Sequence, residues 1–441
     1  MTKFLTVGGG GREHAAVDAL HRSGAKVYAV MKNRNPGISA LAEKVLLADE
    51  KDVSSICSFA QENGVEMAFI GPEAPLEKGI VDSLEAMGVP CASPTQAAAR
   101  IETSKTFMRQ LVEDHGIDGN LGFASFSDAE SAKAYAKDAP YQLVVKPVGL
   151  TGGKGVKVEG EHLKSYQDVC DYIDEIFQQN IGGAGVILEE RAVGEEFTQM
   201  VFCDGFSIAP MPMVQDHKRA FEGDVGPNTG GMGSYSDANH LLPFVSARER
   251  EEALAILQSI VDALRAEGCP YRGPMYGQFM LTVDGPRIIE INARFGDPEA
   301  MNVLPILETG FTEICQRMAS GGLPKKVDFR PLATVCKYVV PEGYGVKSVS
   351  GKPITVDEAQ IRKSGAVAFY ANVDMKEGHL VTGTSRSVGV VGMAENLEQA
   401  ERNCEAALSF VQGEAIRVRH DIGKRELVQR RVDHMRQLRS R

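Results

Sequence analysis

Short continuous runs of apolar residues alternate with longer amphipathic stretches in the first hundred residues. The runs at Phe4 to Val7, Lys26 to Val30 and Glu66 to Ile70 have the length of buried strands, and the stretches between them have helical character. Strands without polar alternation, separated by helices, are typical of a parallel sheet covered on both faces. We therefore expect an open α/β sheet in this part of the chain.

Four glycines follow the first strand directly. Gly8 to Gly11 lead into Arg12 to His21, which has helical character. Unpaired N–H groups and the helix dipole favour an anion at such a helix N-terminus, so this turn predicts a phosphate site. The dinucleotide fingerprint fails because Glu13 or His14 stands where its third glycine belongs, and a nicotinamide cofactor is not expected.

A second turn, Gly71 to Pro75, follows the third strand. Open α/β sheets place ligands at the carboxyl ends of their strands, which favours a binding role for this turn. A rigid turn without a ligand explains its prolines equally well.

Glycines also surround a lysine in the segment Tyr141 to Val158. Gln142 to Val145 is predicted to be a strand that ends at Lys146, and Val156 to Val158 to be another. The loop between them contains Lys154 and four glycines, Gly149, Gly152, Gly153 and Gly155. The Walker A pattern fails at its first glycine and at its Ser or Thr. A flexible loop that closes over a triphosphate is favoured over an ordinary hairpin, because lysines supply point charges and glycines expose N–H donors.

Two later segments add polar groups. The predicted strand Gly185 to Glu190 ends in carboxylates, which suit an adenine amino group and ribose hydroxyls, although such pairs are often only solvated. Gln215 to Tyr235 combines Asp216, His217 and Lys218 with many glycines, and we expect it to be an irregular functional loop.

Polar and apolar residues alternate in the stretch RIIEINARFGDPE, which begins at residue 287. On a strand, the side chains of Glu290, Asn292 and Arg294 project from one face, and those of Ile289 and Ile291 from the other, into a core. Carboxylate and amide oxygens suit Mg²⁺, and an arginine can hold phosphate or carboxylate oxygens in a bidentate grip. The alternative is an amphipathic strand with a solvated face.

A hairpin is predicted just before this strand. Gln278 to Val283 is rich in apolar residues, and the Asp-Gly pair that follows is a hairpin signal. This turn sets Val283 against Arg287 and Gln278 against Asn292, which brings another oxygen beside the proposed ligands.

Length and charge exclude several classes of protein. A chain of 441 residues with 43% hydrophobic residues is expected to form two to four domains. Its formal net charge of −11 argues against a general nucleic-acid surface, and no apolar run has the roughly 18 residues of a membrane span. Glycines interrupt the apolar start before it reaches the length of a signal peptide, so a cytoplasmic protein is expected.

Sulfur and imidazole groups are scattered. The eight cysteines form no CxxC pair, and the nine histidines form no HExxH motif. We therefore expect reduced cysteines in the core and no transition-metal centre.

The last seventeen residues, from Arg425, are rich in arginine. Val428, Val432 and Met435 recur at helical spacing, which predicts a helix with one apolar stripe. This helix is expected to pack on its own domain, with docking to an acidic partner as the alternative.

Several motifs together resemble one family. They are GGGGREHA near the start, GPEAPL, SPT followed by SKTFM at Ser104 to Met108, QDHKR, GPNTGGMGSY, and RFGDPE at Arg294 to Glu299. In this order they are similar to the glycinamide ribonucleotide synthetases, or phosphoribosylamine–glycine ligases, of the ATP-grasp superfamily. The similarity runs from residue 3 to about residue 300 and weakens after about residue 330.

This resemblance implies an ATP-dependent ligation of glycine to 5-phosphoribosylamine through a glycyl phosphate, with Mg²⁺ or Mn²⁺, in de novo purine synthesis. It implies a multidomain α/β and α+β fold in four parts. These are a Rossmann-like N-terminal domain at 1–103, a central ATP-grasp domain at 104–118 and 190–329, a small lid at 119–189, and a β-rich C-terminal domain at 330–441. The expected partners are small molecules, with no nucleic acid or membrane, and the chain is expected to be a monomer or homodimer.

The resemblance also implies a role for each matching residue. The metal ligands are Glu290, Asn292 and Gln278, of which Gln278 rests partly on the hairpin register. The nucleotide residues are Lys105, Lys146, Gly152, Gly153, Lys154, Gly155, Glu189, Val193 and Glu196. The glycine end has Arg294 for the carboxylate and Asp216 for the ammonium group, and with Lys146 these are the catalytic candidates. The remaining substrate residues are Gly9, Gly10, Gly11, Arg12, Pro72, Glu73, Lys218, Gly230 and Gly231.

Two segments depart from the family pattern. The lid reads KPVGLTGGKG where many members have a sequence closer to KADGLAAGKG, but both of its lysines are kept. The C-terminal segments VVPEGYG and AVAFYANV match poorly, so substrate contacts from this domain are in doubt. Two alternatives stay open: another ATP-grasp ligase of purine synthesis, and a non-catalytic nucleotide-binding regulator.

Overall fold

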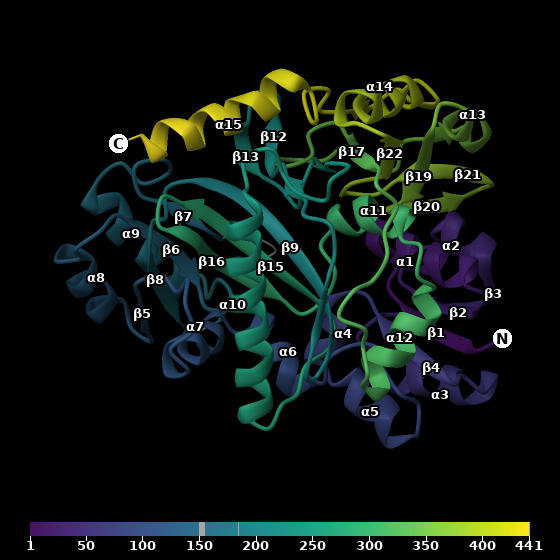
Figure 1. The fold of residues 1–441 in the computed structure, drawn as a ribbon, viewed down its shortest axis with the longest axis horizontal. Helices are drawn as coiled ribbons and strands as arrows, with labels where there is room; N and C mark the ends of the chain where they lie inside the picture. Colours follow the sequence, from purple (N-terminus) through teal and green to yellow (C-terminus); the bar gives the residue numbers. More distant parts are fainter. Residues whose placement is uncertain (150–154, 184, 441) are drawn as a thin grey trace.

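The computed structural model describes residues 1–149, 155–183 and 185–440. These residues form four sheets of four or more strands, which Figure 1 shows with the helices that cover them.

The N-terminal sheet is parallel, with strand order β3-β2-β1-β4. Its strands are β1 (Lys3–Val7), β2 (Lys26–Met31), β3 (Ala42–Leu47) and β4 (Met67–Ile70). Its helices are α1 (Gly11–Arg22), α2 (Pro36–Leu41), α3 (Val53–Asn63), α4 (Glu73–Glu77), α5 (Ile80–Ala86) and α6 (Gln96–Thr103). The predicted open α/β sheet is confirmed, and β1 runs through the glycines into α1 as expected.

A small antiparallel sheet follows, with strand order β5-β8-β6-β7. Its elements are β5 (Phe123–Phe126), α8 (Ala129–Lys137), β6 (Leu143–Pro147), β7 (Lys157–Val158), α9 (Tyr166–Gln178) and β8 (Val186–Glu190). Helix α9 begins with a capping box in which the Ser165 side chain accepts from the Asp168 N–H, while the Asp168 carboxylate accepts from the Ser165 N–H. This part has its own hydrophobic cluster around Val145, Ile173 and Leu188, so it packs as a compact unit.

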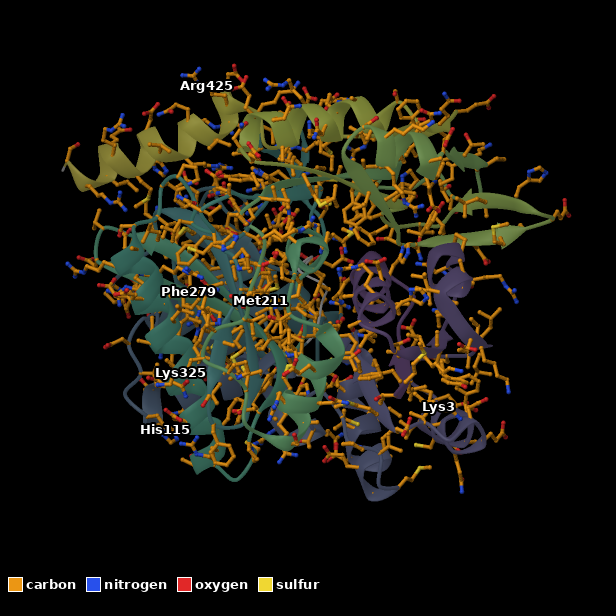
Figure 2. All side chains as sticks on the ribbon, turned by 45° about the vertical axis from the view of Figure 1, so that its right-hand side comes forward. Lys3, His115, Met211, Phe279, Lys325 and Arg425 are labelled. Atoms are coloured by element: carbon orange, nitrogen blue, oxygen red, sulfur yellow. The ribbon has the colours of Figure 1, made fainter. Side chains whose placement is uncertain are left out.

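The central sheet is antiparallel, with strand order β10-β9-β15-β16. Its strands are β9 (Glu195–Asp204), β10 (Ile208–Pro210), β15 (Arg272–Thr282) and β16 (Gly285–Asn292). Helices α7 (Lys105–Asp114) and α10 (Ala247–Ala266) contact it, and Figure 1 shows α10 crossing in front of the sheet. In Figure 2, Met211 and Phe279 lie in the interior of the molecule, where both are fully buried.

The predicted register of the β15–β16 hairpin is wrong. Gln278 pairs with Glu290, and Met280 rather than Val283 pairs with Arg287. The main cause is the turn, because Thr282 pairs with Gly285 and only Val283 and Asp284 lie between them. A bulge opposite the Gln278–Phe279 step then inserts one unpaired residue into β16 and places Gln278 opposite Glu290. As a result, Ile288 is fully buried, whereas Ile289 is only partly buried.

The C-terminal sheet has the order β11-β14-β17-β22-β19, with β24 paired to β17. Its strands are β11 (Gln215–Asp216), β14 (Gly233–Ser236), β17 (Ala333–Pro341), β19 (Ala366–Tyr370), β22 (Val388–Ala394) and β24 (Ile416–Arg417). Three two-stranded pairs are formed by β12 (Arg219–Phe221) with β13 (Val225–Asn228), β18 (Ile354–Val356) with β23 (Val411–Gly413), and β20 (Val373–Lys376) with β21 (His379–Thr382). The segment Gln215 to Tyr235, expected to be irregular, thus contributes four short strands. Within it, β11 pairs with β14 and β12 with β13, and β14 also pairs with the distant strand β17.

The remaining helices lie in the last third of the chain. They are α11 (Glu299–Val303), η1 (Leu304–Ile306), α12 (Phe311–Ser320), α13 (Glu358–Lys363), α14 (Leu397–Leu408) and α15 (Arg425–Arg439).

Helix α15 was expected to pack on its own domain, but it also packs on the central part of the chain. It begins at Arg425, at the surface in Figure 2, and runs along the top of Figure 1 from the C-terminal sheet toward the small sheet. Its side chains contact β9 and the β12–β13 turn, which come from the central part of the chain. Val428 and Met435 are buried in the large hydrophobic cluster that also contains Phe244 and Val245. The apolar stripe was predicted correctly, but its partner was not.

The eight cysteines are all free, and all but Cys57 are buried, as expected. No helix among the described residues is both long enough and apolar enough to span a membrane.

Candidate active site

One face of the central sheet carries the predicted oxygen ligands. The register places Gln278 between Thr198 on β9 and Glu290 on β16, so three strands each contribute a polar side chain to this face. Asn292 lies two residues beyond Glu290, and its Nδ2 donates to Glu290 Oε1 at 3.2 Å. The expectation that Gln278 lies beside the other candidate ligands therefore holds, although its partner is Glu290.

The chemistry of this donor set fits Mg²⁺. The ion prefers oxygen ligands and keeps several waters and substrate phosphates, so one carboxylate with neighbouring amides is sufficient. Burial opposes the charge on Glu290, but Lys218, the Asn292 hydrogen bond and Lys146 hold the pKa of this carboxyl below its ordinary value. Gln278 is less free, because its Oε1 accepts from Lys218 Nζ at 2.7 Å and its Nε2 donates to Glu196. Among the described residues, no group of three or more His, Cys, Asp or Glu side chains is placed to hold a metal.

Glu189 and Lys146 form a buried ion-pair cluster. The Glu189 side chain is 1% exposed. Its carboxylate accepts two hydrogen bonds from Arg109, of 3.0 and 2.9 Å, and one from Lys146 Nζ at 2.5 Å. Burial raises the pKa of Glu189, but these two cations outweigh it and bring the pKa to about 2. Both carboxylate oxygens are thus occupied, so the side chain orients Lys146, and its expected contact with adenine or ribose stays a prediction. Arg109 was not recognised in the sequence, because only the fold brings α7 against β8.

The other nucleotide candidates surround this cluster. Lys105 Nζ donates to the Gly149 carbonyl at 2.7 Å, and burial lowers the pKa of Lys105. Glu196 and Val193 are exposed on and just before β9. The Gly155 carbonyl accepts from the Tyr172 hydroxyl at 2.7 Å. Three predicted lid residues, Gly152, Gly153 and Lys154, lie outside the described residues.

Arg294 is anchored by two carboxylates. Its Nη2 lies 2.7 Å from Glu102 Oε1, and its Nε lies 3.6 Å from Glu73 Oε2. The Glu102 carboxylate also accepts from the Ala293 N–H at 2.6 Å, and burial raises the pKa of Glu102 to about 7 despite the nearby guanidinium. Within the described residues, the buried Nε of Arg294 has no hydrogen-bond partner. This arginine is therefore held in place with a donor left for an anion.

Asp216 offers a carboxylate acceptor, in contrast to the guanidinium donor of Arg294. Its buried Oδ1 has no hydrogen-bond partner in the part of the chain that the structure describes. Burial and the nearby Glu299 raise the pKa of Asp216 well above its ordinary value. Glu299 is itself buried and accepts from Thr198 Oγ1 at 3.1 Å. A bound ammonium group would relieve this unfavourable pair of carboxylates.

The glycine turn and α1 meet this site through Arg12. Arg12 Nη2 lies 3.9 Å from the Glu73 carboxylate, and Nη1 donates to the Phe295 carbonyl at 3.1 Å. Glu73 therefore lies between Arg12 and Arg294, which brings the two predicted turns together at the RFGDPE segment. The Gly10 N–H, however, already donates to Glu13 Oε2 at 2.9 Å. One N–H group of the predicted phosphate site is thus occupied.

Pro72 and the neighbouring glycines are also brought together. Pro72 is the N-cap of α4, and a Cβ added at Gly8 would meet the Pro72 ring at 2.9 Å. Gly9 and Gly10 complete the turn into α1. The Gly71–Pro75 turn therefore adjoins the glycine turn, and its binding role stays a prediction.

The C-terminal domain contributes Tyr338 and Arg386, which sequence reasoning missed. Asp297 Oδ1 accepts from the Tyr338 hydroxyl at 2.6 Å, and Asp297 Oδ2 lies 3.2 Å from Arg386 Nη2. Arg386 Nη1 also donates to the carbonyls of Gly230, Gly231 and Asp297. Only the fold brings Arg386 to the glycine loop, so this domain adjoins the site, although none of these contacts is with a substrate.

Comparisons with known proteins cover nearly the whole chain. Family models described as phosphoribosylglycinamide synthetase match residues 2–102 (N domain), 103–300 (ATP-grasp domain) and 334–425 (C domain). The C-domain match ends at the first residue of α15. The similarity therefore continues through the C domain, beyond the point near residue 330 after which it was expected to weaken.

Individual relatives agree with the family models. The phosphoribosylamine–glycine ligase of Methanothermobacter thermautotrophicus is 53% identical over 99% of this chain and 100% of its own. That of Pyrococcus furiosus is 48% identical over 100% of this chain and 98% of its own.

Solved structures show the same architecture. The crystal structure of the phosphoribosylamine–glycine ligase from Thermotoga maritima has a TM-score of 0.81 at 27% identity, over 95% of this chain and 100% of its own. A Campylobacter jejuni biotin carboxylase in a β-γ-ATP complex has a TM-score of 0.73 at 14% identity, over 99% and 98%, and shares the fold. The chain belongs to the phosphoribosylglycinamide synthetase family and has the multidomain ATP-grasp fold.

Proposed function

We propose that the chain joins glycine to 5-phosphoribosylamine at the expense of ATP, giving glycinamide ribonucleotide, ADP and phosphate in de novo purine synthesis. Two relatives that match 99% of this chain, at 53% and 49% identity, are named for this activity, which supports the proposal. One observation in the site carries it. Arg294 Nε and Asp216 Oδ1 are buried polar atoms that make no hydrogen bond among the described residues, and they match the carboxylate and ammonium ends of glycine.

Tyr276 relates these two groups in space. The Arg294 guanidinium lies 5.9 Å from the centre of its ring, and the charge of Asp216 contributes to the raised pKa of its hydroxyl, after burial and Glu299. The Tyr276 hydroxyl also donates to Gln278 Oε1 at 3.4 Å, so the proposed glycine end adjoins the oxygen ligands. This arrangement suits a zwitterion beside a metal-bound triphosphate.

Glu290 and Asn292 would hold Mg²⁺ or Mn²⁺, with Gln278 as a less free third ligand. The ion would neutralise charge on the ATP phosphates. Lys105 and Lys146 are proposed to bind phosphate oxygens, and Glu196, with Val193 near it, is proposed to contact the adenine and ribose of ATP.

The proposed chemistry has two displacements. A glycine carboxylate oxygen attacks the γ-phosphorus and ADP leaves, which forms glycyl phosphate. The amine of phosphoribosylamine then attacks the carbonyl carbon, phosphate leaves, and the amine loses a proton. Acyl phosphates hydrolyse easily, so the protein must position the reactants and exclude water.

We divide the chain as the family resemblance implied. Residues 1–103 are proposed to bind phosphoribosylamine with Gly9 to Arg12, Pro72 and Glu73. Residues 104–118 and 190–329 form the ATP-grasp domain, 119–189 a lid, and 330–441 the C-terminal domain. The eight free cysteines suit a reducing cytoplasm, and a monomer or homodimer is expected.

Component omission tests the function. The purified protein is given Mg-ATP and glycine, with phosphoribosylamine formed in place from ribose 5-phosphate and ammonia, and ADP release is followed while each component is left out. Release that needs all of them, with glycinamide ribonucleotide detected by mass, supports the proposal. Release that ignores glycine favours another ATP-grasp ligase, and ATP binding without release favours a regulator.

A further inference from the structure

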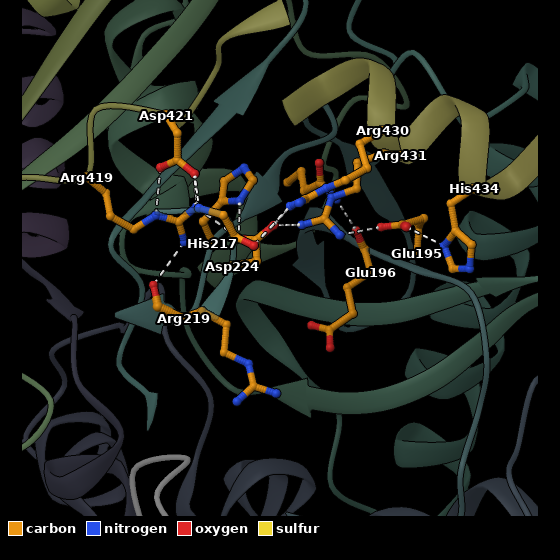
Figure 3. Close-up of polar contacts among 12 residues, drawn as sticks. Glu195, Glu196, His217, Arg219, Asp224, Arg419, Asp421, Arg430, Arg431 and His434 are labelled. Carbon is orange, nitrogen blue, oxygen red and sulfur yellow. Dashed lines mark hydrogen bonds and ion pairs between the residues drawn. The ribbon is translucent and has the colours of Figure 1, made fainter. Parts of the chain in front are cut away.

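Helix α15 contacts carboxylates from two separate segments of the central part of the chain. Arg431 Nη1 lies 3.0 Å from Glu195 Oε2 on β9, and Arg431 Nη2 contacts Asp224 Oδ2 in the β12–β13 turn. One helical turn later, His434 Nδ1 lies 2.6 Å from Glu195 Oε1. Figure 3 shows Arg431 reaching from the helix to both carboxylates.

Both carboxylates adjoin residues of the candidate site. Glu195 directly precedes Glu196, and successive side chains on a strand point to opposite faces. Asp224 Oδ1 lies 3.4 Å from Nδ1 of His217, which stands between Asp216 and Lys218 in the chain.

The two segments are also joined on the side of the site. Lys218 Nζ lies 3.8 Å from Glu196 Oε2, and both side chains meet Gln278. Thus Lys218 and Glu196 connect the segments at the site, and Arg431 connects them behind it.

The ion pairs of Asp224 behind the site are strong enough to hold the two segments at a fixed spacing. Asp224 is 16% exposed, and its carboxylate meets Arg419 at 2.9 Å, Arg430 at 2.7 Å and Arg431. Burial opposes its charge, but the hydrogen bond with His217 and the charges of Arg431 and Arg419 hold the pKa of Asp224 well below its ordinary range. Charge-assisted hydrogen bonds with little exposure to water are stronger than those of exposed pairs. Among the described residues, Arg431 alone contacts both Asp224 and Glu195.

We propose that Arg431 is a positioning residue, which fixes the spacing between Glu195–Glu196 and Asp216–Lys218 from behind the site. It does not touch the substrates itself. Helix α15 lies beyond the matched C domain, so the family assignment gives this helix no role. The inference rests on the proposed function of the site, and it predicts that substrate binding depends on a residue outside it.

The experiment compares four variants of the full chain. Arg431→Met removes both contacts, and Arg431→Lys keeps the charge but not the fork that spans two carboxylates. Arg430→Met removes a contact with Asp224 only. Arg439→Met is the matched control, because Arg439 lies on the same helix and pairs at 2.6 Å with Glu249, which is not part of the site.

We expect Arg431→Met to raise the KM for ATP and for glycine by about tenfold, with a smaller change in kcat, because misplaced binding groups weaken binding first. Arg431→Lys should recover part of this loss, and Arg430→Met should have a smaller effect. Arg439→Met should keep both KM values. Thermal unfolding of all four variants shows whether each one is folded at the assay temperature.

Two results would overturn the proposal: unchanged KM values in Arg431→Met, or equal increases in Arg431→Met and Arg439→Met. Binding of Mg-ATP measured by calorimetry gives a readout that does not need turnover. If the wild-type chain binds ATP but fails the omission assay, the proposed function fails. The calorimetric comparison of Arg431→Met with Arg439→Met still tests the positioning role in that case.

Discussion

Asp216 shows how a single residue can lower the stability of the fold and still suit a functional role. Its carboxylate is buried near a second carboxylate, Glu299, and one oxygen has no partner among the described residues. Such a group costs free energy in the folded chain unless a ligand satisfies it. Buried polar atoms of this kind concentrate at functional sites.

Asp216→Asn tests the proposed ammonium site. The variant removes the charge but keeps the size, so the KM for glycine should rise by roughly 10- to 100-fold, the range of a lost charged hydrogen bond. The KM for ATP should change much less. Steady-state kinetics with each substrate varied in turn checks this, and equal increases for both substrates would count against the assignment.

Glu290→Gln tests the metal ligands. Loss of the only carboxylate in the proposed set should reduce kcat by at least about 100-fold, because the ATP phosphates lose their metal-borne positive charge. The fold should survive, since Glu290 is replaced by a side chain of equal size on a preformed strand. ADP release and circular dichroism are the measurements. Near-normal turnover would mean that the metal lies elsewhere.

At the scale of elements, short segments gain their roles from the strands and helices they meet. The bulge in β16 moves Gln278 opposite Glu290, and Arg386 ties the loop before β14 to Asp297. A Cβ at Gly231, whose φ is +107°, would come within 2.7 Å of Asp216 Oδ1. The position of this loop therefore limits access to the proposed glycine end.

Arg386→Met should disturb that loop. It removes the cation that pairs with Asp297 and leaves several carbonyls without their donor, so kcat/KM for glycine should fall by on the order of 100-fold. Arg265→Met is the control. Arg265 donates to the Gly205 carbonyl, pairs with Asp262 at 2.8 Å and lies over Phe206, so it has the same kinds of contact away from the site. Similar losses in both variants would show a general effect on folding.

At the scale of the whole molecule, the N-terminal sheet and the C-terminal domain share a buried polar interface. The Tyr370 N–H on β19 donates to His14 Nδ1 on α1 at 2.9 Å. Asn35 Nδ2 donates to the carbonyls of Gly9 and Tyr370 at 2.9 and 2.8 Å. These contacts hold the glycine turn against a domain that follows it by more than 300 residues.

This interface should be sensitive to acid. Burial lowers the pKa of His14 to about 4, although Asp18 opposes the shift. The unfolded chain then binds more protons than the folded chain between the ordinary value of 6.5 and about 4, so stability is lost as the pH falls through this window.

His14→Gln, which does not titrate, supplies the reference. As the pH is lowered through this window, the free energy of unfolding of the wild type should decrease relative to that of the variant. The slope should reach up to about 1.4 kcal/mol per pH unit. Denaturant titrations at several pH values measure it. Parallel curves for the two proteins across the window would contradict the assignment.

Local pattern was sufficient for much of the fold. The strands β1, β2 and β4, the glycine turn into α1, the strand β16 and the helix α15 follow from runs, alternation and periodicity that a few neighbouring residues determine. The grouping of Glu290 with Asn292 follows from the same alternation. Motif order added the family, which the comparisons confirm.

Contacts between distant segments needed the tertiary structure. The bulge in β16 depends on packing across β15, and a one-residue insertion changes which isoleucine is buried. Arg109, Arg386 and Arg431 come from segments far in sequence from Glu189, Gly230 and Glu195, and nothing in their local sequence indicates those partners. The sequence by itself determined the elements and the ligand chemistry, because these depend on local geometry and residue type. Only the tertiary structure decided which charges meet, because burial and pairing depend on how the elements pack.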